Sequence, residues 1–243
     1  MTRPWSIWIG YEPRQAEAFA VLRESIQRYS RHIPVRGLVL SRLMNEGLYT
    51  RPTHRRLGRL FDERSVSDSY DGAMSTEFAI SRFLVPHLAQ DGLALFMDCD
   101  MLCRVNITEA FKLAAADPDK AVHCVKHDFR PMTGVKMDGQ AQTQYERKNW
   151  SSFMIFDCNH PANNALTLPL VNEAPGRDLH AFKWLADCDI GELPVEWNYL
   201  VAHTNPLINP KVVHWTDGGP WLEAFRNAPY ADEWYEERDR WAA

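Results

Sequence analysis

Residues 93–100 place five apolar residues directly before two aspartates that are one residue apart. An apolar run of this kind is typical of a strand buried on both faces, as in a parallel sheet between helices. In open α/β sheets, ligands bind just beyond the carboxyl ends of such strands. We therefore expect Asp98 and Asp100 at such an edge, where two carboxylates suit Mn²⁺ or Mg²⁺ holding a diphosphate.

Two further Asp-x-Asp triplets lack this context. Asp117 and Asp119 follow an alanine-rich helical pattern and flank a proline, which prevents the helix from continuing. Asp187 and Asp189 repeat the letters Asp-Cys-Asp after another helical pattern. Both triplets are interpreted as solvated helix ends, so only the first one is a candidate metal site.

The hydrophobic pattern alternates strands with helices along the chain. Strands are expected at residues 5–9, 35–40, 93–97, 121–125, 150–157 and 211–215, and helices at residues 13–29, 76–88, 106–116, 178–186 and 221–243. This order predicts an α/β fold with a mixed, mainly parallel sheet flanked by helices and a right-handed first crossover. Residues 51–70 fit neither pattern. Residues 126–149 carry little periodicity, which is typical of a lid or binding loop.

Composition excludes several classes of protein. The net charge of −5 does not indicate a general nucleic-acid surface. The one basic cluster is interpreted as a solvated helix face or a loop on the acceptor side, and it comprises Arg51, His54, Arg55, Arg56 and Arg59. Five cysteines without a Cys-x-x-Cys pair predict reduced thiols in a cytoplasmic protein. No apolar run is long enough for a signal peptide or a membrane span.

Further residues gain meaning if the two aspartates hold a metal. His214 ends a short apolar run and can complete the ligand set for Mn²⁺, although it also fits a hydrogen-bonded core histidine. Gly218 and Gly219 let backbone N–H groups approach a phosphate, or form a plain tight turn. Tyr11 follows the first strand and either stacks on a base or is an exposed turn aromatic. Arg82 lies on the helix before the strand and can reach a diphosphate or the carboxylates.

Several motifs together resemble the signature of family 8 glycosyltransferases. Residues 81–88 followed by 95–100 resemble their Arg-x-x-x-Pro helix and Asp-x-Asp strand. Trp197 and Asn198 resemble their Trp-Asn segment, and His214 with residues 220–221 resembles their closing His…Lys-Pro-Trp motif. The match spans most of the chain in the family's order. It implies a GT-A (Rossmann-like) fold and hexosyl transfer, with retention, from a nucleotide sugar, usually a UDP-sugar, to an acceptor that the sequence does not identify.

The resemblance also implies roles for individual residues. Asp98, Asp100 and His214 would hold Mn²⁺ (or Mg²⁺), and Asp178 and Arg82 would be catalytic. Donor contacts are expected from Tyr11, Arg82, Cys99, Gly218 and Gly219. The whole chain is expected to form one domain, with residues 1–125 as the nucleotide-binding half. Residues 126–243 would be the half for sugar and acceptor, ending in a helical tail.

Three departures from the family pattern keep two alternatives open. Gly219 stands where the family has a lysine, residues 151–153 replace its Asn-Ser-Gly segment, and Asp178 alone remains of its acidic helix motif. One alternative is a sugar nucleotidylyltransferase, although Gly10 is the only glycine in residues 10–13, where that class needs a Gly-rich phosphate loop. The other is a non-catalytic module of the same fold that binds a nucleotide sugar or is purely structural.

Overall fold

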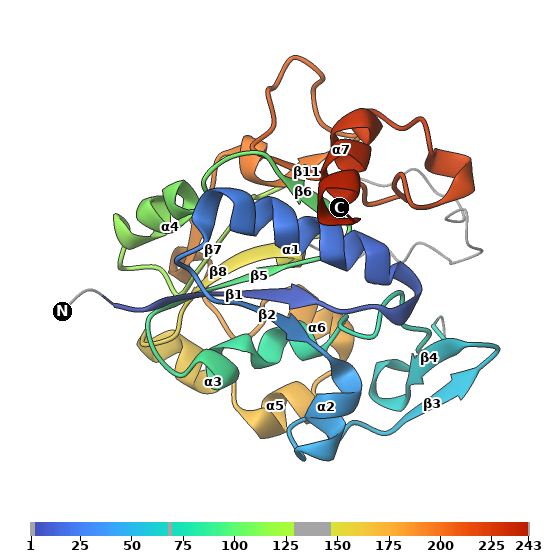
Figure 1. The fold of residues 1–243 in the computed structure, drawn as a ribbon. Helices are drawn as coiled ribbons and strands as arrows, with labels where there is room; N and C mark the ends of the chain where they lie inside the picture. The colour runs from blue at the N-terminus through green and yellow to red at the C-terminus, as the bar shows by residue number, and fades with distance from the viewer. Residues whose placement is uncertain (1–2, 68–69, 129–146, 243) are drawn as a thin grey trace.

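The computed structural model describes residues 3–67, 70–128 and 147–242 (Figure 1). Its central layer is a six-stranded sheet in the order β2-β1-β5-β8-β7-β9. All neighbouring strands are parallel except β8, which runs antiparallel to both β5 and β7. These strands are β1 (Trp5–Gly10), β2 (Val35–Leu38), β5 (Leu93–Met97), β7 (Val122–Cys124), β8 (Phe153–Asp157) and β9 (Ile190–Glu192). The sheet confirms the predicted α/β class.

Two smaller sheets accompany the central one. A three-stranded sheet has the order β10-β11-β6, in which β11 runs parallel to β10 and antiparallel to β6. A two-stranded hairpin is formed by β3 and β4. The bounds are β3 (Thr53–Arg56), β4 (Arg59–Asp62), β6 (Met101–Cys103), β10 (Tyr199–Leu200) and β11 (Val212–His214). Because β6 starts directly after Asp100, its pairing with β11 brings His214 toward the end of β5.

Helices cover both faces of the central sheet, with α1 on one side and α2, α3 and α5 on the other, and α7 packs against α1 and the three-stranded sheet (Figure 1). The helices are α1 (Ala16–Ser30), α2 (Leu40–Asn45), α3 (Val85–Ala89), α4 (Thr108–Ala115), α5 (Leu168–Glu173), α6 (Gly176–His180) and α7 (Ala231–Ala242). β5 is buried along its whole length, as expected for a strand with helices on both faces. One apolar cluster joins side chains from Ile7 to Val212, so both halves of the chain contribute to it.

The helix expected at residues 76–88 is wrong in its bounds. The structure has a 3-10 helix, Ser81–Leu84, followed by the short α3. Pro86 has no backbone N–H, so it cannot make the α-helical bond to the carbonyl of Arg82. The N–H of Val85 makes the shorter 3-10 bond to that carbonyl instead.

Two other expected helices are shorter than predicted. The helix expected at residues 178–186 is α6, which ends at His180, because Phe182 takes a φ of 54° and turns its fully buried ring into the core. In the tail, only α7 is an α-helix, and Glu223–Phe225 forms a single 3-10 turn. Pro229 and the positive φ of Tyr230 prevent an earlier start.

The basic cluster does not lie on a helix. Most of its members lie on the β3–β4 hairpin, which projects beside the main body in Figure 1. Arg51 is buried, and its guanidinium pairs with the equally buried carboxylate of Asp62 at 2.6 Å. Of the expected loop at residues 126–149, positions 129–146 lie outside the described residues. Within the described ranges, the helices are too short or too polar to cross a membrane.

Candidate metal and diphosphate site

The candidate site lies where the strand order of the central sheet reverses. From β1, the chain first adds β2 on one side and later adds β5 on the other. β1 and β5 are parallel and in register from Trp5 opposite Leu93 to Ile9 opposite Met97, so Tyr11 and Asp98 emerge at the same edge. In doubly wound sheets, such a switch point forms the crevice that receives ligands.

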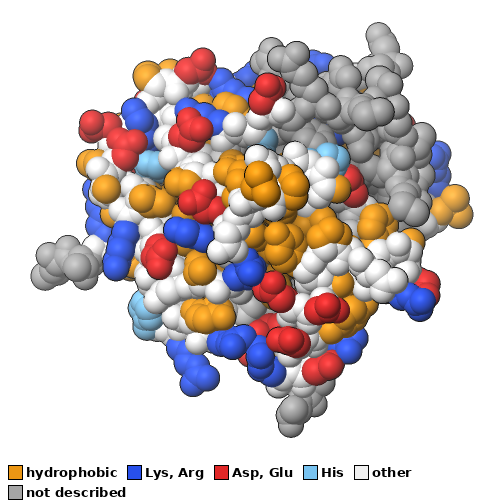
Figure 2. Space-filling view, turned by 90° about the horizontal axis from the view of Figure 1, so that it is seen from above, with side chains coloured by type: hydrophobic (Ala, Val, Ile, Leu, Met, Phe, Trp, Pro, Cys, Tyr) orange, Lys and Arg blue, Asp and Glu red, His pale blue; other side chains and the backbone are white. Residues whose placement is uncertain are grey.

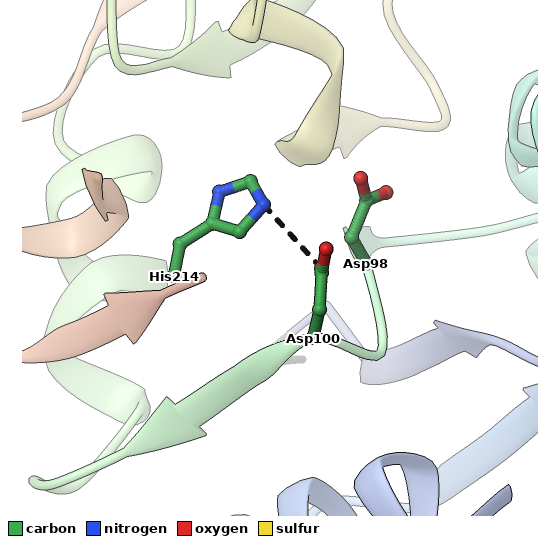
Figure 3. A group of neighbouring side chains, drawn as sticks. All are labelled: Asp98, Asp100 and His214. Atoms are coloured by element: carbon green, nitrogen blue, oxygen red, sulfur yellow. Dashed lines mark ion pairs between the residues drawn. The ribbon is translucent and has the colours of Figure 1, made fainter. Parts of the chain in front are cut away.

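Three metal-competent side chains converge at this edge (Figure 3). Asp98 and Asp100 come from the turn after β5, and His214 ends β11. Each offers one ligand atom, and these atoms lie within 4.8 Å of one another. His214 Nε2 lies 3.3 Å from Asp100 Oδ1. Two carboxylates and an imidazole, nearly buried but open at the carboxylates, fit a hard divalent cation such as Mn²⁺ or Mg²⁺.

Backbone hydrogen bonds fix the turn that carries the two aspartates. The N–H of Asp98 donates to the carbonyl of Ser152 at 2.9 Å, and the N–H of Trp215 donates to the carbonyl of Asp100 at 3.0 Å. The first bond ties the turn to the start of β8, and the second ties it to the end of β11. The backbone of the site is therefore fixed between the end of β5, the start of β8 and the end of β11.

Arg82 is part of the site. Its Nη1 lies 2.8 Å from Asp98 Oδ1 and donates to the carbonyl of Ser151 at 2.8 Å. Its guanidinium lies against two neighbouring rings, with Cζ 5.3 Å from the ring centroid of Phe78 and 4.8 Å from that of Phe96. Gly10 permits this packing, because a Cβ there would lie 2.3 Å from Cγ of Phe78. The cation is thus rigidly placed beside the first aspartate.

Behind Arg82, a neutral histidine fixes the turn before β8. His180 Nδ1 lies 2.7 Å from the hydroxyl of Ser151. Burial lowers the pKa of His180 to about 3, and the positive charge of Arg82 contributes to the decrease. The imidazole is therefore neutral at physiological pH, and its Nδ1 shares a hydrogen bond with the hydroxyl of Ser151.

A second chain of polar groups reaches His214. Its Nδ1 lies 2.8 Å from Oδ1 of Asn198, whose amide nitrogen donates to the hydroxyl of Ser152 at 2.9 Å. Trp197, which precedes Asn198 in the sequence, is fully buried and packs against Phe153 of β8. The consecutive residues Ser151 and Ser152 thus support the arginine and the histidine of the site, respectively.

The donor-binding residues expected near the turn occupy different environments. Tyr11 lies at the same sheet edge as Asp98, partly exposed, with its ring edge-on to Phe19 at 5.2 Å. Cys99 is completely buried, and its thiol donates to Gln15 Oε1 at 3.2 Å. Burial raises the pKa of the Cys99 thiol, and Asp100 and Asp98 raise it further. Cys99 therefore anchors the turn against the start of α1.

Gly218 and Gly219 are required by packing in the turn after β11. Gly218 has a φ of 135°, and a Cβ there would lie 2.6 Å from the ring of Phe225. A Cβ on Gly219 would lie 2.2 Å from the ring of Trp221. Both glycines thus let aromatic rings approach the backbone, and their role toward a phosphate stays a prediction.

Asp178 lies on α6, two residues before His180. Its carboxylate pairs with Lys183 Nζ at 2.7 Å and lies 3.5 Å from Arg177 Nε. The ligand atoms that converge within 4.8 Å do not include it among the described residues. Its role toward a sugar stays a prediction.

Sequence reasoning assigned no role to four residues that support the site. These are Ser151, Ser152, His180 and Asn198. Asn198 was visible only as part of the Trp-Asn segment, and residues 151–153 only as a departure from the family pattern. Serine and asparagine are common in loops, so these contacts, which join segments 29 to 46 residues apart, leave no local signal.

The charged side chains of the surface are mixed in sign. Figure 2 shows Lys, Arg, Asp and Glu interspersed around a central group of hydrophobic side chains. On this face, no broad basic area is visible of the kind that binds nucleic acid.

Solved structures with the same fold are glycosyltransferases. The chain is similar to the bifunctional glycosyltransferase WbbM, with 16% identity over 98% of this chain and a TM-score of 0.56, and it spans about half (52%) of that chain. It is also similar to the galactosyltransferase LgtC in complex with donor and acceptor sugar analogs. That match has 13% identity over 97% of this chain and 95% of LgtC, with a TM-score of 0.58. These likenesses show the GT-A fold.

One relative is much closer in sequence. The protein named Protein CDI from Arabidopsis thaliana is 39% identical over 246 aligned residues, which cover 98% of this chain and 88% of the relative. A comparison with models of known protein families finds no match. Identity at this level over nearly the whole length shows common descent. The chain is a GT-A-fold protein that belongs to the family of Arabidopsis Protein CDI.

Proposed function

We propose that this protein is a metal-dependent glycosyltransferase that transfers a hexose from a nucleotide sugar, in the first instance a UDP-sugar, to an acceptor with retention. The observation that carries the proposal is the convergence of Asp98, Asp100 and His214 at the switch point of a GT-A sheet. The similarity to LgtC, whose structure contains donor and acceptor sugar analogs, supports it. Mn²⁺, or Mg²⁺, would be held by these three side chains.

The chemistry requires departure of a nucleoside diphosphate from the anomeric carbon. A bound divalent cation stabilises the negative charge that develops on the leaving phosphate oxygens. Asp98 and Asp100 would supply two anionic ligands to this cation. The ion pair with Arg82 limits the rotation of the Asp98 side chain. Tyr11 would stack on the base. Asp178 would contact the sugar, in which case its pairing with Lys183 has to yield to the substrate.

A cavity beside the site offers room for the acceptor. It has a volume of about 650 Å³ and lies beyond the ends of β7 and β9, with polar lining from Lys126, His127, Glu192 and His203. Another lining residue, Leu200, pairs with His214 in the small sheet, so the cavity adjoins the candidate metal ligand. Burial and the charge of His214 lower the pKa of His127 to about 4, against a raising contribution from the backbone of Asn198. We assign the acceptor to this cavity.

The two Asp-Cys-Asp triplets provide a matched test. Asp100→Asn changes a candidate metal ligand, and Asp189→Asn makes the same change at a carboxylate that, within the described residues, accepts a hydrogen bond from the N–H of Ala186. The measurement is Mn²⁺-dependent release of hexose and UDP from UDP-hexoses, with GDP-hexoses in parallel. Asp100→Asn is expected to lower the rate by about 100-fold, the usual loss when one electrostatic stabiliser is removed.

Asp189→Asn is expected to keep the wild-type rate, because an asparagine oxygen can still accept the capping bond. Equal losses in the two variants would show that the site is wrongly placed. A folded wild-type protein that releases sugar from none of these donors would favour the non-catalytic module instead.

A further inference from the structure

We infer that Asn198, oriented by the turn at residues 149–152, is a positioning residue that fixes the tautomer of His214 so that its Nε2 is available to a metal ion. Its importance for metal binding rests on the proposed function, whereas the tautomer itself does not. One chain of hydrogen bonds runs from the backbone carbonyl of Asn149 through the amide of Asn198 to the imidazole of His214. Asn198 is completely buried and His214 is 2% exposed, so bulk water cannot replace these contacts.

The amide of Asn198 can point in only one direction. Its Nδ2 lies 3.3 Å from the carbonyl of Asn149, a group that can only accept a hydrogen bond. The hydroxyl of Ser152 donates to the same carbonyl at 2.7 Å, so its oxygen is left to accept from Nδ2 at 2.9 Å. Both contacts require a donor on this side of the amide. The other side, facing His214, is therefore the carbonyl oxygen Oδ1.

This orientation decides which imidazole nitrogen carries the proton. Oδ1 of Asn198 only accepts, so Nδ1 of His214, 2.8 Å away, must donate. In the neutral imidazole, the lone pair is then on Nε2, which lies 3.3 Å from Oδ1 of Asp100. A hydrogen bond to one ring nitrogen is the usual way in which proteins orient a metal-binding histidine and set its tautomer.

The backbone conformation at Asn149 places the carbonyl that orients the Asn198 amide. This residue has a φ of 66°, in the left-handed region, and so turns its carbonyl toward both Asn198 and Ser152. Trp197 holds Asn198 in place by packing fully buried against Phe153. The turn before β8, which the family resemblance associates with a sugar contact, thus orients a metal ligand in this protein.

The tautomer can be observed directly in the metal-free protein. Two-dimensional ¹H–¹⁵N correlation spectra of the histidine ring distinguish a protonated from an unprotonated nitrogen. In the wild-type protein, Nδ1 of His214 is expected to carry a proton. A wild-type spectrum in which this nitrogen is unprotonated overturns the inference without reference to any substrate.

Two substitutions at Asn198 separate orientation from packing. Asn198→Asp keeps an acceptor facing Nδ1, whereas Asn198→Leu removes it at similar volume. Mn²⁺ binding, followed by the manganese electron paramagnetic resonance signal, is expected to weaken by about 10- to 100-fold in Asn198→Leu, the usual effect of losing such a support. Asn198→Asp is expected to bind Mn²⁺ more tightly than Asn198→Leu does, although its carboxylate no longer donates to the carbonyl of Asn149.

The control is Asn172→Leu, because Asn172 is also buried and bonded to backbone groups, but around α5. It is expected to lower stability and leave Mn²⁺ affinity unchanged. Unchanged Mn²⁺ affinity in Asn198→Leu overturns the positioning role. If the ring spectra show the expected tautomer but no nucleotide sugar is turned over, the inference holds and the proposed function fails.

Discussion

At the scale of single residues, contacts within the protein fix the position of the Arg82 guanidinium. It pairs with Asp98, donates to the carbonyls of Ser151 and Ala79, and lies against the rings of Phe78 and Phe96. Arg82 is 5% exposed, so its charge is not screened by water. These contacts favour a positioning role, in which Arg82 acts on a bound diphosphate through Asp98.

Removal of this arginine breaks the ion pair that Arg82 Nη1 makes with Asp98 Oδ1 at 2.8 Å. Arg82→Met is expected to lower the free energy of unfolding by about 3 kcal/mol, at the low end for a broken buried pair. The low end applies because the side chain of Asp98 is still 16% exposed. Urea unfolding measures the change, with Asp98→Asn and the double variant completing a cycle.

The double variant is expected to be more stable than Arg82→Met alone, since the carboxylate that has lost its arginine is then removed as well. Strictly additive losses would contradict the ion pair as the dominant interaction of Arg82.

The sequence predicted the candidate ligands themselves because each one follows an apolar run. Asp98 and Asp100 come after β5, and His214 ends β11. It could not predict the polar residues that support them. Asn198 and Ser152 are bonded across 46 residues, and a single sequence contains no periodicity that would relate such positions.

At the scale of elements, α6 is linked to the start of β8 by a buried neutral histidine. His180 lies on the short α6, bonds to the hydroxyl of Ser151 and packs edge-on against Phe83 at 5.2 Å. Burial, followed by the charge of Arg82, lowers the pKa of His180 to about 3. Protonation of His180 therefore favours the unfolded chain, in which histidine has a pKa of about 6.5.

The sign of the pH dependence follows from these values. Below about pH 6.5 the unfolded state binds a proton at His180 that the folded state does not bind until about pH 3. The contribution of His180 is thus fully present above pH 6.5 and decreases by about 1.4 kcal/mol per pH unit as the pH falls through this window. His180→Asn is expected to make the acid-side slope of the free energy of unfolding shallower by this amount.

Urea unfolding at several pH values between 4 and 7 measures the slope, with His87→Asn, a change at an exposed histidine, as the control. An unchanged slope in His180→Asn would contradict the buried neutral state.

The bounds of elements were predictable only where local chemistry decides them. The buried strand at residues 93–97 is confirmed, because five apolar residues have no other low-energy environment. The helix expected at 178–186 ends early because the ring of Phe182 is more favourably placed in the core, which a local pattern does not contain. The β3–β4 hairpin could not be predicted from its charged residues. One of them, Arg55, pairs with Glu77 outside the hairpin, and a local pattern does not contain that contact.

At the scale of the whole molecule, the order of strands creates the site. The strand order reverses between β1 and β5, at the edge where Asp98 emerges, and β11 brings His214 to the same place. The alternation of strands and helices predicts this class of sheet, and the family resemblance predicts its GT-A form. The antiparallel β8 in the middle of the sheet could not be predicted, since the apolar pattern of a buried strand is the same in either direction.

We expect the sheet edge that carries Asp98, Asp100 and His214 to bind a divalent cation together with a nucleoside diphosphate. Thermal unfolding with UDP or GDP, each with and without Mn²⁺, tests it most directly. A ligand at about 100 times its dissociation constant adds about 2.7 kcal/mol to the free energy of unfolding, which raises the Tm of a chain of this size by about 5–10 °C. We expect such a rise for at least one of the two nucleotides, and only when Mn²⁺ is present. Equal Tm values with and without Mn²⁺ for both nucleotides would contradict the account.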